Sequence, residues 1–333
     1  MSTPPRVLVP AAIATTPPAL GGRVHEFAGR TMGTTWRVRL VAASTLRREP
    51  VRQAIQAVLD AVVAQMSTWD AASDLARFNR AAPGTWHALP EHFHAVLACA
   101  REVAERSAGA FDPTAGPLVD AWGFGPVARR GHAAAAALAD ARRRAGWRRL
   151  AIDPVRRALL QPGGLALDLS AIAKGFGVDL VARRLDALGI TDHLVEVGGE
   201  LRGSGVRPDG QPWWVALEQP DDGDAGQQTL LALHGLSVAT SGDYRRWFEH
   251  DGTRYSHTID PRDGRPIRHG LASVTVIHAD CMRADAWSTA LGVLGPDAGL
   301  ALANRLGLAA RLLLRVGDGF AERRSAAFDA LLR

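Results

Sequence analysis

The segment ADAWSTALGVLG, residues 284–295, predicts a helix that is buried in the core. Its large apolar residues recur at helical spacing: Trp287, Ala290, Leu291 and Leu294. The same segment holds Asp285 and Thr289, which lie one turn apart on one face, so both oxygens can point at one ligand. The alternative is structural: Asp285 caps the helix, and Thr289 bonds to the carbonyl one turn earlier.

Outward from this helix, apolar periodicity predicts an α+β domain. Strands are expected at residues 34–42, 165–169, 193–197, 213–218, 230–233 and 272–277, and a hairpin about residues 317–319. Amphipathic helices are expected around residues 55–66, 93–103 and 176–188. Residues 1–22 are rich in proline and threonine, so we expect a flexible N-terminal tail there.

The composition is that of a soluble globular chain, with 47% hydrophobic and 22% charged residues. The net charge of +5 raises the possibility of a nucleic-acid binder, but the arginines are spread along the chain. The one dense cluster, residues 142–149, is typical of a solvated helix face. No segment has the ~20 apolar residues of a membrane helix. We therefore expect no nucleic-acid partner and no membrane span.

Lys174 is the only lysine in the chain, since the other basic residues are all arginine. Lysine is a compact ammonium on a slim stem, whereas arginine is planar and wider. The retention of one lysine indicates a narrow site that needs this side chain, although chance survival at a surface position is the alternative.

Four polar clusters lie in loops or at the ends of elements, around Asp112, around Asp168 and Lys174, at His257 and Asp260, and at Asp285 with Thr289. The chain has no dinucleotide-binding glycine fingerprint and no Walker loop. Carboxylate, hydroxyl and carbonyl oxygens together suit magnesium, whereas zinc would want His or Cys clusters. A cation, a lysine and a proton acceptor such as His257 fit phosphoryl transfer.

The motifs that surround these clusters carry a family resemblance, from about residue 31 to residue 295. They are TMGTTW, SDLARFN, GAFDPTAGPLVDAWGFG, LDLSAIAKGFGVD, EVGGELRGSG, SVATSGDYRRWFE, HTIDPRDGRP and ADAWSTALGVLG. In this order they resemble the FAD:protein FMN transferase family, also called ApbE. The resemblance implies one ApbE-like α+β domain over residues 23–333, with mixed or antiparallel sheets flanked by helices.

Members of that family bind FAD with Mg²⁺ and move the FMN half onto a Ser or Thr hydroxyl of an acceptor flavoprotein, a subunit of a redox complex, with release of AMP. By matching motifs, the resemblance implies these FAD contacts: Met32, Ala110, Phe111, Asp112, Asp168, Lys174 and Ile259. It assigns the magnesium to the Ala171 carbonyl, Asp285 and Thr289.

Together these interpretations give a catalytic set of His257, Lys174 and Asp285. Magnesium and Lys174 would neutralise the pyrophosphate and the developing AMP charge, while His257 takes the hydroxyl proton, with Asp260 or Asp243 as alternative bases. The same site could instead use water, as a magnesium-dependent FAD pyrophosphatase giving FMN and AMP. A non-catalytic FAD-binding module is the third possibility.

Two features depart from the family pattern. Many members are exported as lipoproteins, but the N-terminal residues show no lipobox cysteine and no convincing signal. We therefore expect a cytoplasmic protein, or a periplasmic or membrane-associated one if the true start differs. The alanine- and arginine-rich segment at residues 128–149 also departs from the pattern and suggests no function of its own.

Overall fold

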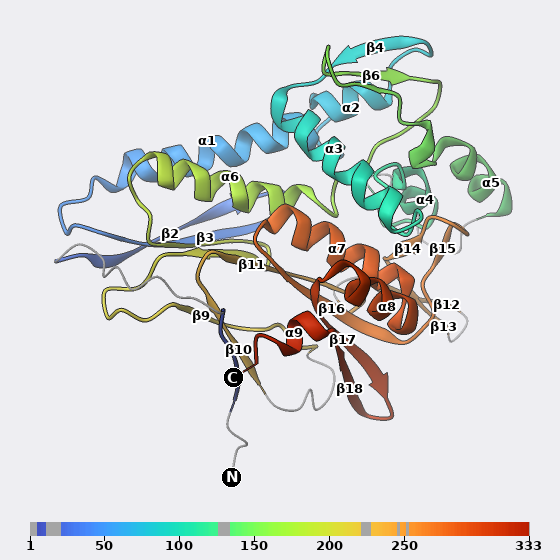
Figure 1. Ribbon diagram of the computed structural model, residues 1–333. Coiled ribbons are helices and arrows are strands. Elements are labelled where there is room, and N and C mark those ends of the chain that lie inside the picture. The colour runs from blue at the N-terminus through green and yellow to red at the C-terminus, as the bar shows by residue number, and fades with distance from the viewer. Residues whose placement is uncertain are drawn as a thin grey trace.

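An eight-stranded antiparallel sheet runs through the centre of the computed structural model (Figure 1). The model describes residues 5–10, 21–125, 134–220, 228–244, 247–250 and 253–332. In spatial order the strands are β18 (Gly319–Arg324), β17 (Ala309–Val316), β16 (Leu271–His278), β11 (Leu236–Gly242), β8 (Glu200–Ser204), β7 (His193–Val197), β3 (Thr34–Ala42) and β2 (Arg23–Thr31). The α+β prediction with antiparallel sheets and flanking helices is thus confirmed.

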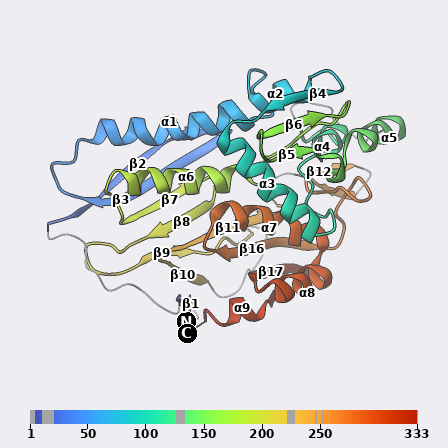
Figure 2. The same ribbon diagram turned by 45° about the horizontal axis from the view of Figure 1, so that its top comes forward.

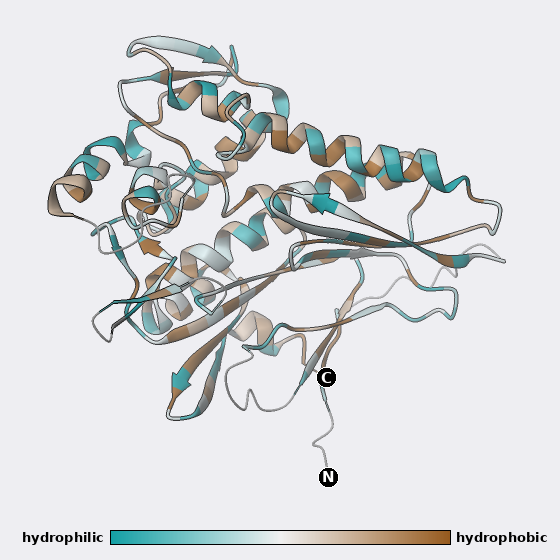
Figure 3. Cartoon of the chain, turned by 180° about the vertical axis from the view of Figure 1, so that it is seen from behind, coloured by the Kyte–Doolittle hydropathy of each residue, from teal (hydrophilic) through white to brown (hydrophobic). Residues whose placement is uncertain are grey.

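One face of this sheet is covered by helices, which lie side by side in both views (Figures 1 and 2). They are α1 (Arg48–Met66), α6 (Ala173–Ala187) and α7 (Cys281–Leu294), with α3 (Glu91–Arg106) and α8 (Pro296–Leu306) packed beyond them. In Figure 3 the ribbon of α1 alternates between hydrophobic and hydrophilic residues, as an amphipathic helix does. Its apolar side packs on α6 and β2 and belongs to a buried cluster with residues of β3 and β7, in which Ile55 and Leu59 are fully buried.

Short elements complete this layer. The helical ones are α2 (Asp74–Asn79), α4 (Gly116–Ala121), α5 (Ala135–Arg144) and the 3₁₀ turn Trp147–Arg149. A small sheet is formed by β4 (Thr85–Ala88), β6 (Ala158–Gln161) and β5 (Ile152–Asp153). Two hairpins pair β12 (Trp247–His250) with β13 (Thr253–Ser256), and β14 (Ile259–Asp260) with β15 (Arg265–Pro266). In the described part of the chain, no helix is long and apolar enough to cross a membrane.

The opposite face of the sheet is covered by a three-stranded sheet and a short helix. They are β1 (Arg6–Leu8), β10 (Thr229–Leu233) and β9 (Trp213–Ala216), with α9 (Ala326–Asp329). The expectation of a flexible tail is therefore wrong for residues 6–8, because they pair in parallel with β10 and bury Leu8 completely against Phe328 and its neighbours. Residues 1–4 and 11–20 of that tail lie outside the described residues.

The strands predicted at residues 34–42 and 193–197 are β3 and β7, and the predicted hairpin is β17 with β18. The strand expected at residues 165–169 is wrong, because this extended segment joins no sheet. Side chains replace the ladder: Asn79 accepts from Leu167 N (2.7 Å) and donates to Leu167 O (2.9 Å). Gln161 binds Leu165 in the same two-sided way. These hydrogen bonds hold the extended segment, which contains Asp168, without a neighbouring strand.

Candidate active site

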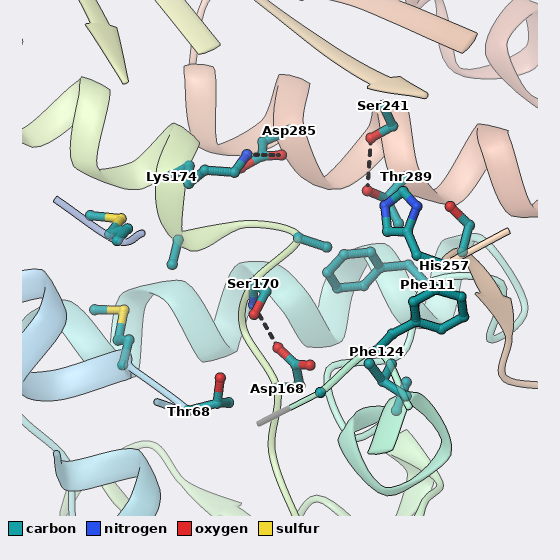
Figure 4. Close-up of a pocket in the computed structure, with 18 of the residues that line it drawn as sticks. Thr68, Phe111, Phe124, Asp168, Ser170, Lys174, Ser241, His257, Asp285 and Thr289 are labelled. Carbon is teal, nitrogen blue, oxygen red and sulfur yellow. Dashed lines mark hydrogen bonds and ion pairs between the residues drawn. The ribbon is translucent and has the colours of Figure 1, made fainter. Parts of the chain in front are cut away.

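A cavity of about 930 Å³ opens between the C-terminal end of α1, the start of α6, one side of α7 and the loops beside α4 and β14. It is lined by every residue that the sequence assigned to FAD, metal or catalysis: Met32, Ala110, Phe111, Asp112, Asp168, Ala171, Lys174, His257, Ile259, Asp285 and Thr289. Figure 4 shows Lys174 and Asp285 together on one wall, and Phe111, Phe124 and His257 on another. The fold therefore brings these distant segments around a single space.

Asp285 lies inside α7 and does not cap it. The helix begins at Cys281, and its first amides donate to the buried carboxylate of Asp179, from Cys281 N (3.1 Å) and Met282 N (2.9 Å). Asp285 is only 3% exposed and lines the cavity one turn further on. The structural alternative for this residue is wrong because another aspartate already does the capping.

Thr289 also differs from that alternative. Its hydroxyl is 3.0 Å from Ser241 Oγ on β11, and it is Ser288 that donates back to the Asp285 carbonyl, at 2.8 Å. Asp285 and Thr289 thus line the cavity from adjacent turns of one helix, beside the end of β11.

The contact between α6 and α7 depends on Gly175. A Cβ at this position would lie 2.3 Å from Cys281 O and 2.8 Å from Asp285 Cβ, which a side chain could not occupy without spreading the helices. The Gly175 amide donates to Asp285 Oδ2 at 2.9 Å. Gly175 is the third residue of α6, and the amides of a first turn have no acceptor within their helix, so the Asp285 side chain supplies the acceptor here. Ala171 precedes the helix and lines the cavity.

Lys174 reaches across to two carboxylates. Its Nζ is 2.5 Å from Glu200 Oε1 and 3.8 Å from Asp285 Oδ1. Glu200 is the first residue of β8 and is only 1% exposed. This glutamate stands within the motif EVGGELRGSG, which by itself predicts no role for it. A glutamate placed directly after two glycines, at the start of a buried strand, is the signal that could have identified it.

Trp69 was missed as well. It lines the cavity from the loop after α1, and 64% of it is exposed. A large aromatic residue inside the polar turn MSTWDA is the corresponding sequence signal.

The oxygen donors on the Lys174 wall fit a hard divalent cation. Asp285 supplies a buried carboxylate, Thr289 a hydroxyl and Ala171 a carbonyl. Among the residues that the structure describes, no group of three or more His, Cys, Asp and Glu side chains is placed to hold a metal ion. A single carboxylate with neutral oxygens suits Mg²⁺, which keeps waters and phosphate oxygens as its other ligands, and does not suit Zn²⁺.

The loop that carries Ala110 and Phe111 is held by Asp112. The carboxylate of Asp112 accepts hydrogen bonds from Thr114 N (2.8 Å), Thr114 Oγ1 (2.6 Å) and Trp147 N (3.1 Å). Burial raises its pKa, and the hydrogen bonds from Thr114 and Trp147 oppose that rise. Asp112 thus lines the cavity together with Ala110 and Phe111, and its side chain fixes the loop.

The segment at residues 128–149 acquires a structural role in its described part, from residue 134. Arg142 on α5 donates to the Asp263 carbonyl, and Gly146 N donates to Thr114 Oγ1 at 2.7 Å. Trp147 N binds Asp112, as above. The segment therefore joins the loop at Asp112 to the turn after β14, two walls of the same cavity. Residues 128–133 lie outside the described residues.

The three candidate bases are His257, Asp260 and Asp243. His257 lines the cavity, and its ring centroid is 6.2 Å from that of Phe124. Asp260 does not line it and is bound by Arg262 at 2.7 and 2.9 Å. Asp243 does not line it either, and Arg315 binds both of its oxygens at 2.8 Å. Of the three, His257 is the residue whose side chain can meet a ligand in this cavity.

Comparisons with known proteins identify the family of the chain. The family model described as "ApbE family" matches residues 32–312. An FAD:protein FMN transferase of Vibrio cholerae is 39% identical over 312 residues, 93% of each chain, and one of Klebsiella pneumoniae is 38% identical over 311 residues, 92% of this chain and 89% of the relative.

Solved structures show the same fold. The flavinyl transferase ApbE of Pseudomonas stutzeri, in its apo form, superposes with a TM-score of 0.87 at 42% identity, covering 94% of this chain and 98% of the other. The flavin transferase ApbE from Vibrio cholerae superposes with a TM-score of 0.86 at 36% identity, covering 93% of this chain and all of the other. With a matching family model, relatives above 30% identity and a shared fold over nearly the whole chain, this protein belongs to the ApbE family.

Proposed function

We propose that this protein transfers the FMN half of FAD to a Ser or Thr hydroxyl of an acceptor protein and releases AMP. Its relatives carry the name FAD:protein FMN transferase, which supports FAD as the donor and a protein as the acceptor. One observation carries the proposal to this chain: an oxygen-donor set with a lysine and a separate histidine line the same cavity of about 930 Å³.

In this proposal FAD occupies the cavity against two groups of residues. Met32, Ala110, Phe111 and Ile259 supply mostly apolar contacts, and Asp112, Asp168 and Lys174 supply polar ones. Asp168 is held by the Ser170 amide at 2.8 Å, so its carboxylate is oriented before a ligand arrives. A mostly apolar pocket with a few fixed polar groups is the usual design of a cofactor-sized site.

The Ala171 carbonyl, Asp285 and Thr289 hold Mg²⁺ in the proposal. When bound there, magnesium would neutralise pyrophosphate charge and make the AMP phosphate a better leaving group. The ammonium of Lys174 adds a second positive charge on the same wall, beside the first turn of α6.

His257 takes the proton of the acceptor hydroxyl in the proposed reaction. The hydroxyl oxygen forms a bond to the phosphorus on the riboflavin side, and the bond from that phosphorus to the bridging oxygen of AMP breaks. The products are AMP and a phosphoester between FMN and the acceptor. The ring of His257 lines the cavity, whereas the carboxylates of Asp243 and Asp260 bind arginines outside it.

The acceptor in this proposal is a flavoprotein subunit of a redox complex, as the family resemblance implies. The test incubates the protein with FAD, Mg²⁺ and candidate acceptor domains, and measures intact mass with and without a chelator. We expect the acceptor to gain the mass of FMN, with AMP released and both lost on chelation. FMN and AMP without an adduct on any acceptor would support the pyrophosphatase instead, and intact FAD would support the binding module.

An Asp285→Asn variant tests the metal site in the same assay. We expect the transfer rate to fall by about 100-fold or more, because several kcal/mol of charge stabilisation depend on the cation. The matched control is Asp297→Asn, whose side chain is 89% exposed and pairs with Arg323 away from the cavity. Transfer by Asp285→Asn at the control's rate would refute the metal assignment.

A further inference from the structure

The ammonium of Lys174 lies between two buried carboxylates at unequal distances. Glu200 Oε1 is 2.5 Å from Nζ, and Asp285 Oδ1 is 3.8 Å from it. The side chains of Glu200 and Asp285 are only 2% and 4% exposed, so water screens neither of them well. The lysine is therefore bound directly to Glu200 and only loosely to Asp285.

The backbone around Glu200 places its carboxylate beside Lys174. Glu200 is the first residue of β8, paired with Val197 across a turn of two glycines with positive φ, +62° at Gly198 and +101° at Gly199. A Cβ on Gly198 would lie 3.5 Å from Lys174 Cδ, so the glycine turn runs along the lysine stem. The carboxylate that holds the ammonium thus comes from the sheet, whereas Asp285 comes from α7.

The two oxygens of Asp285 have different partners. Oδ2 accepts the Gly175 amide at 2.9 Å, whereas Oδ1 faces Lys174. A cation that takes Asp285 as a ligand competes with Lys174 for Oδ1. Without the Glu200 charge, Asp285 would be the carboxylate that remains near the ammonium among the described residues, and the carboxylate–ammonium–carboxylate group would lose its net negative charge.

We propose that Glu200 is a positioning residue that holds Lys174 away from Asp285 Oδ1 and so keeps this oxygen open to the divalent cation. The inference rests on the metal site of the proposed function and adds a residue that decides how well that site binds. Glu200 acts through Lys174, so its effect should depend on the presence of the lysine.

A cycle of four proteins tests this dependence with Mn²⁺ as the probe, because it shares the preference of Mg²⁺ for oxygen ligands and its free form is counted by electron paramagnetic resonance. The proteins are the wild type, Glu200→Gln, Lys174→Met and the double variant. We expect Glu200→Gln to weaken Mn²⁺ binding by about tenfold, the usual effect of losing a group that supports a ligand. In the Lys174→Met background the same change should have much less effect, since no ammonium is left to compete.

Glu200→Asp is the conservative control, because it keeps the charge and should recover part of the lost affinity. An equal loss from Glu200→Gln with and without Lys174 would overturn the inference, since a purely structural role does not need the lysine. Undiminished binding by Glu200→Gln, with binding lost in Asp285→Ala, would overturn the role of Glu200 while leaving the metal site standing. Undiminished binding by Asp285→Ala would instead overturn the metal site, and this inference with it.

Discussion

Asp243 and Asp260 bind arginine side chains, whereas His257 lines the cavity with its ring against Phe124. Arginines occupy the carboxylate oxygens of Asp243 and Asp260, and neither of these side chains lines the cavity. The hydrogen-bond partners of each side chain and its place relative to the cavity therefore favour His257 as the base over Asp243 and Asp260. The motif HTIDP alone does not distinguish them.

A His257→Gln variant should lower the transfer rate at saturating FAD by about 100-fold or more, the usual contribution of a general base. The affinity for FAD should change little, because glutamine keeps a polar side chain of similar reach. Initial rates of adduct formation and a titration of flavin fluorescence measure the two quantities separately.

Asp243→Asn is the matched control for His257, because Asp243 is close in sequence but lies outside the cavity. If Asp243→Asn slowed transfer as much as His257→Gln without loss of stability, the assignment of the base to His257 would be wrong.

Helices α6 and α7 are in close contact at Gly175, where no space is left for a side chain. A methyl group there would meet the Cys281 carbonyl and Asp285 Cβ, both fixed parts of α7. We expect Gly175→Ala to lower the free energy of unfolding by about 1–3 kcal/mol and to weaken metal binding, because the helices must separate.

The control for Gly175→Ala lies on α7 itself. A Cβ at Gly292 would meet only Val274 Cγ2, at an ordinary 3.9 Å. Gly292→Ala should therefore leave stability unchanged or raise it, since alanine favours the helix by about 1 kcal/mol. Urea unfolding of both variants measures the difference, and equal effects would contradict the close-contact explanation.

The extended segment at residues 165–169 depends on α2 through one side chain. Asn79→Ala removes both hydrogen bonds to Leu167 and leaves its N–H and C=O without those partners. We expect a loss of about 2 kcal/mol in the free energy of unfolding and a higher KM for FAD, because Asp168 follows directly. The comparison is Gln53→Ala on α1, an exposed residue that donates to Glu49 and should change stability by less than about 0.5 kcal/mol.

The sequence predicts a strand correctly where its backbone hydrogen bonds go to neighbouring strands, and fails where they go to side chains. Strand β3 alternates apolar and polar residues and pairs on both sides, so periodicity predicts its ends correctly. Residues 165–169 are equally apolar, but their backbone binds the side chains of Asn79 and Gln161, a substitution that periodicity cannot detect. Leu8 was missed because a three-residue strand among prolines carries too little pattern.

The candidate site was predicted through motifs more than through spacing. Helical spacing alone placed Asp285 and Thr289 on one face, and the fold then brought every assigned residue to one cavity. Glu200 was missed because its role depends on a lysine 26 residues earlier in the chain, and no local pattern encodes that distance.

The two ends of the chain are joined, because β1 is bound to the last hairpin, β17 with β18. Arg6 on β1 binds Glu322 on β18 at 2.5 and 2.7 Å, and Val9 N donates to the Leu331 carbonyl at 2.8 Å. The neighbouring Arg311 is only 1% exposed, and burial lowers its pKa to about 10. Glu322 is therefore the carboxylate around which three arginines gather, Arg6, Arg311 and Arg324.

Glu322 should make stability depend on acid pH. Burial alone would raise its pKa, but hydrogen bonds from Arg6 and Arg324 outweigh burial and hold the pKa below its ordinary 4.5. A carboxylate with a lowered pKa stabilises the fold above its ordinary pKa, and this contribution is lost as the pH falls through the lowered value. Glu322→Gln should cost about 2 kcal/mol at pH of about 7 and much less at pH of about 3. Urea unfolding at both pH values measures the change, and a constant difference would contradict it.

The single lysine also makes this chain a chemical reporter of its own cavity. Lys174 holds the only side-chain amine, with 26% of the side chain exposed on the cavity wall. Acylation of that amine removes the only cleavage point for a protease that cuts after lysine. A labelled and then unfolded chain should stay in one piece, whereas a chain whose cavity was occupied during labelling should be cut into residues 1–174 and 175–333. The fraction of chains that is cleaved then gives the fraction of molecules that held a ligand.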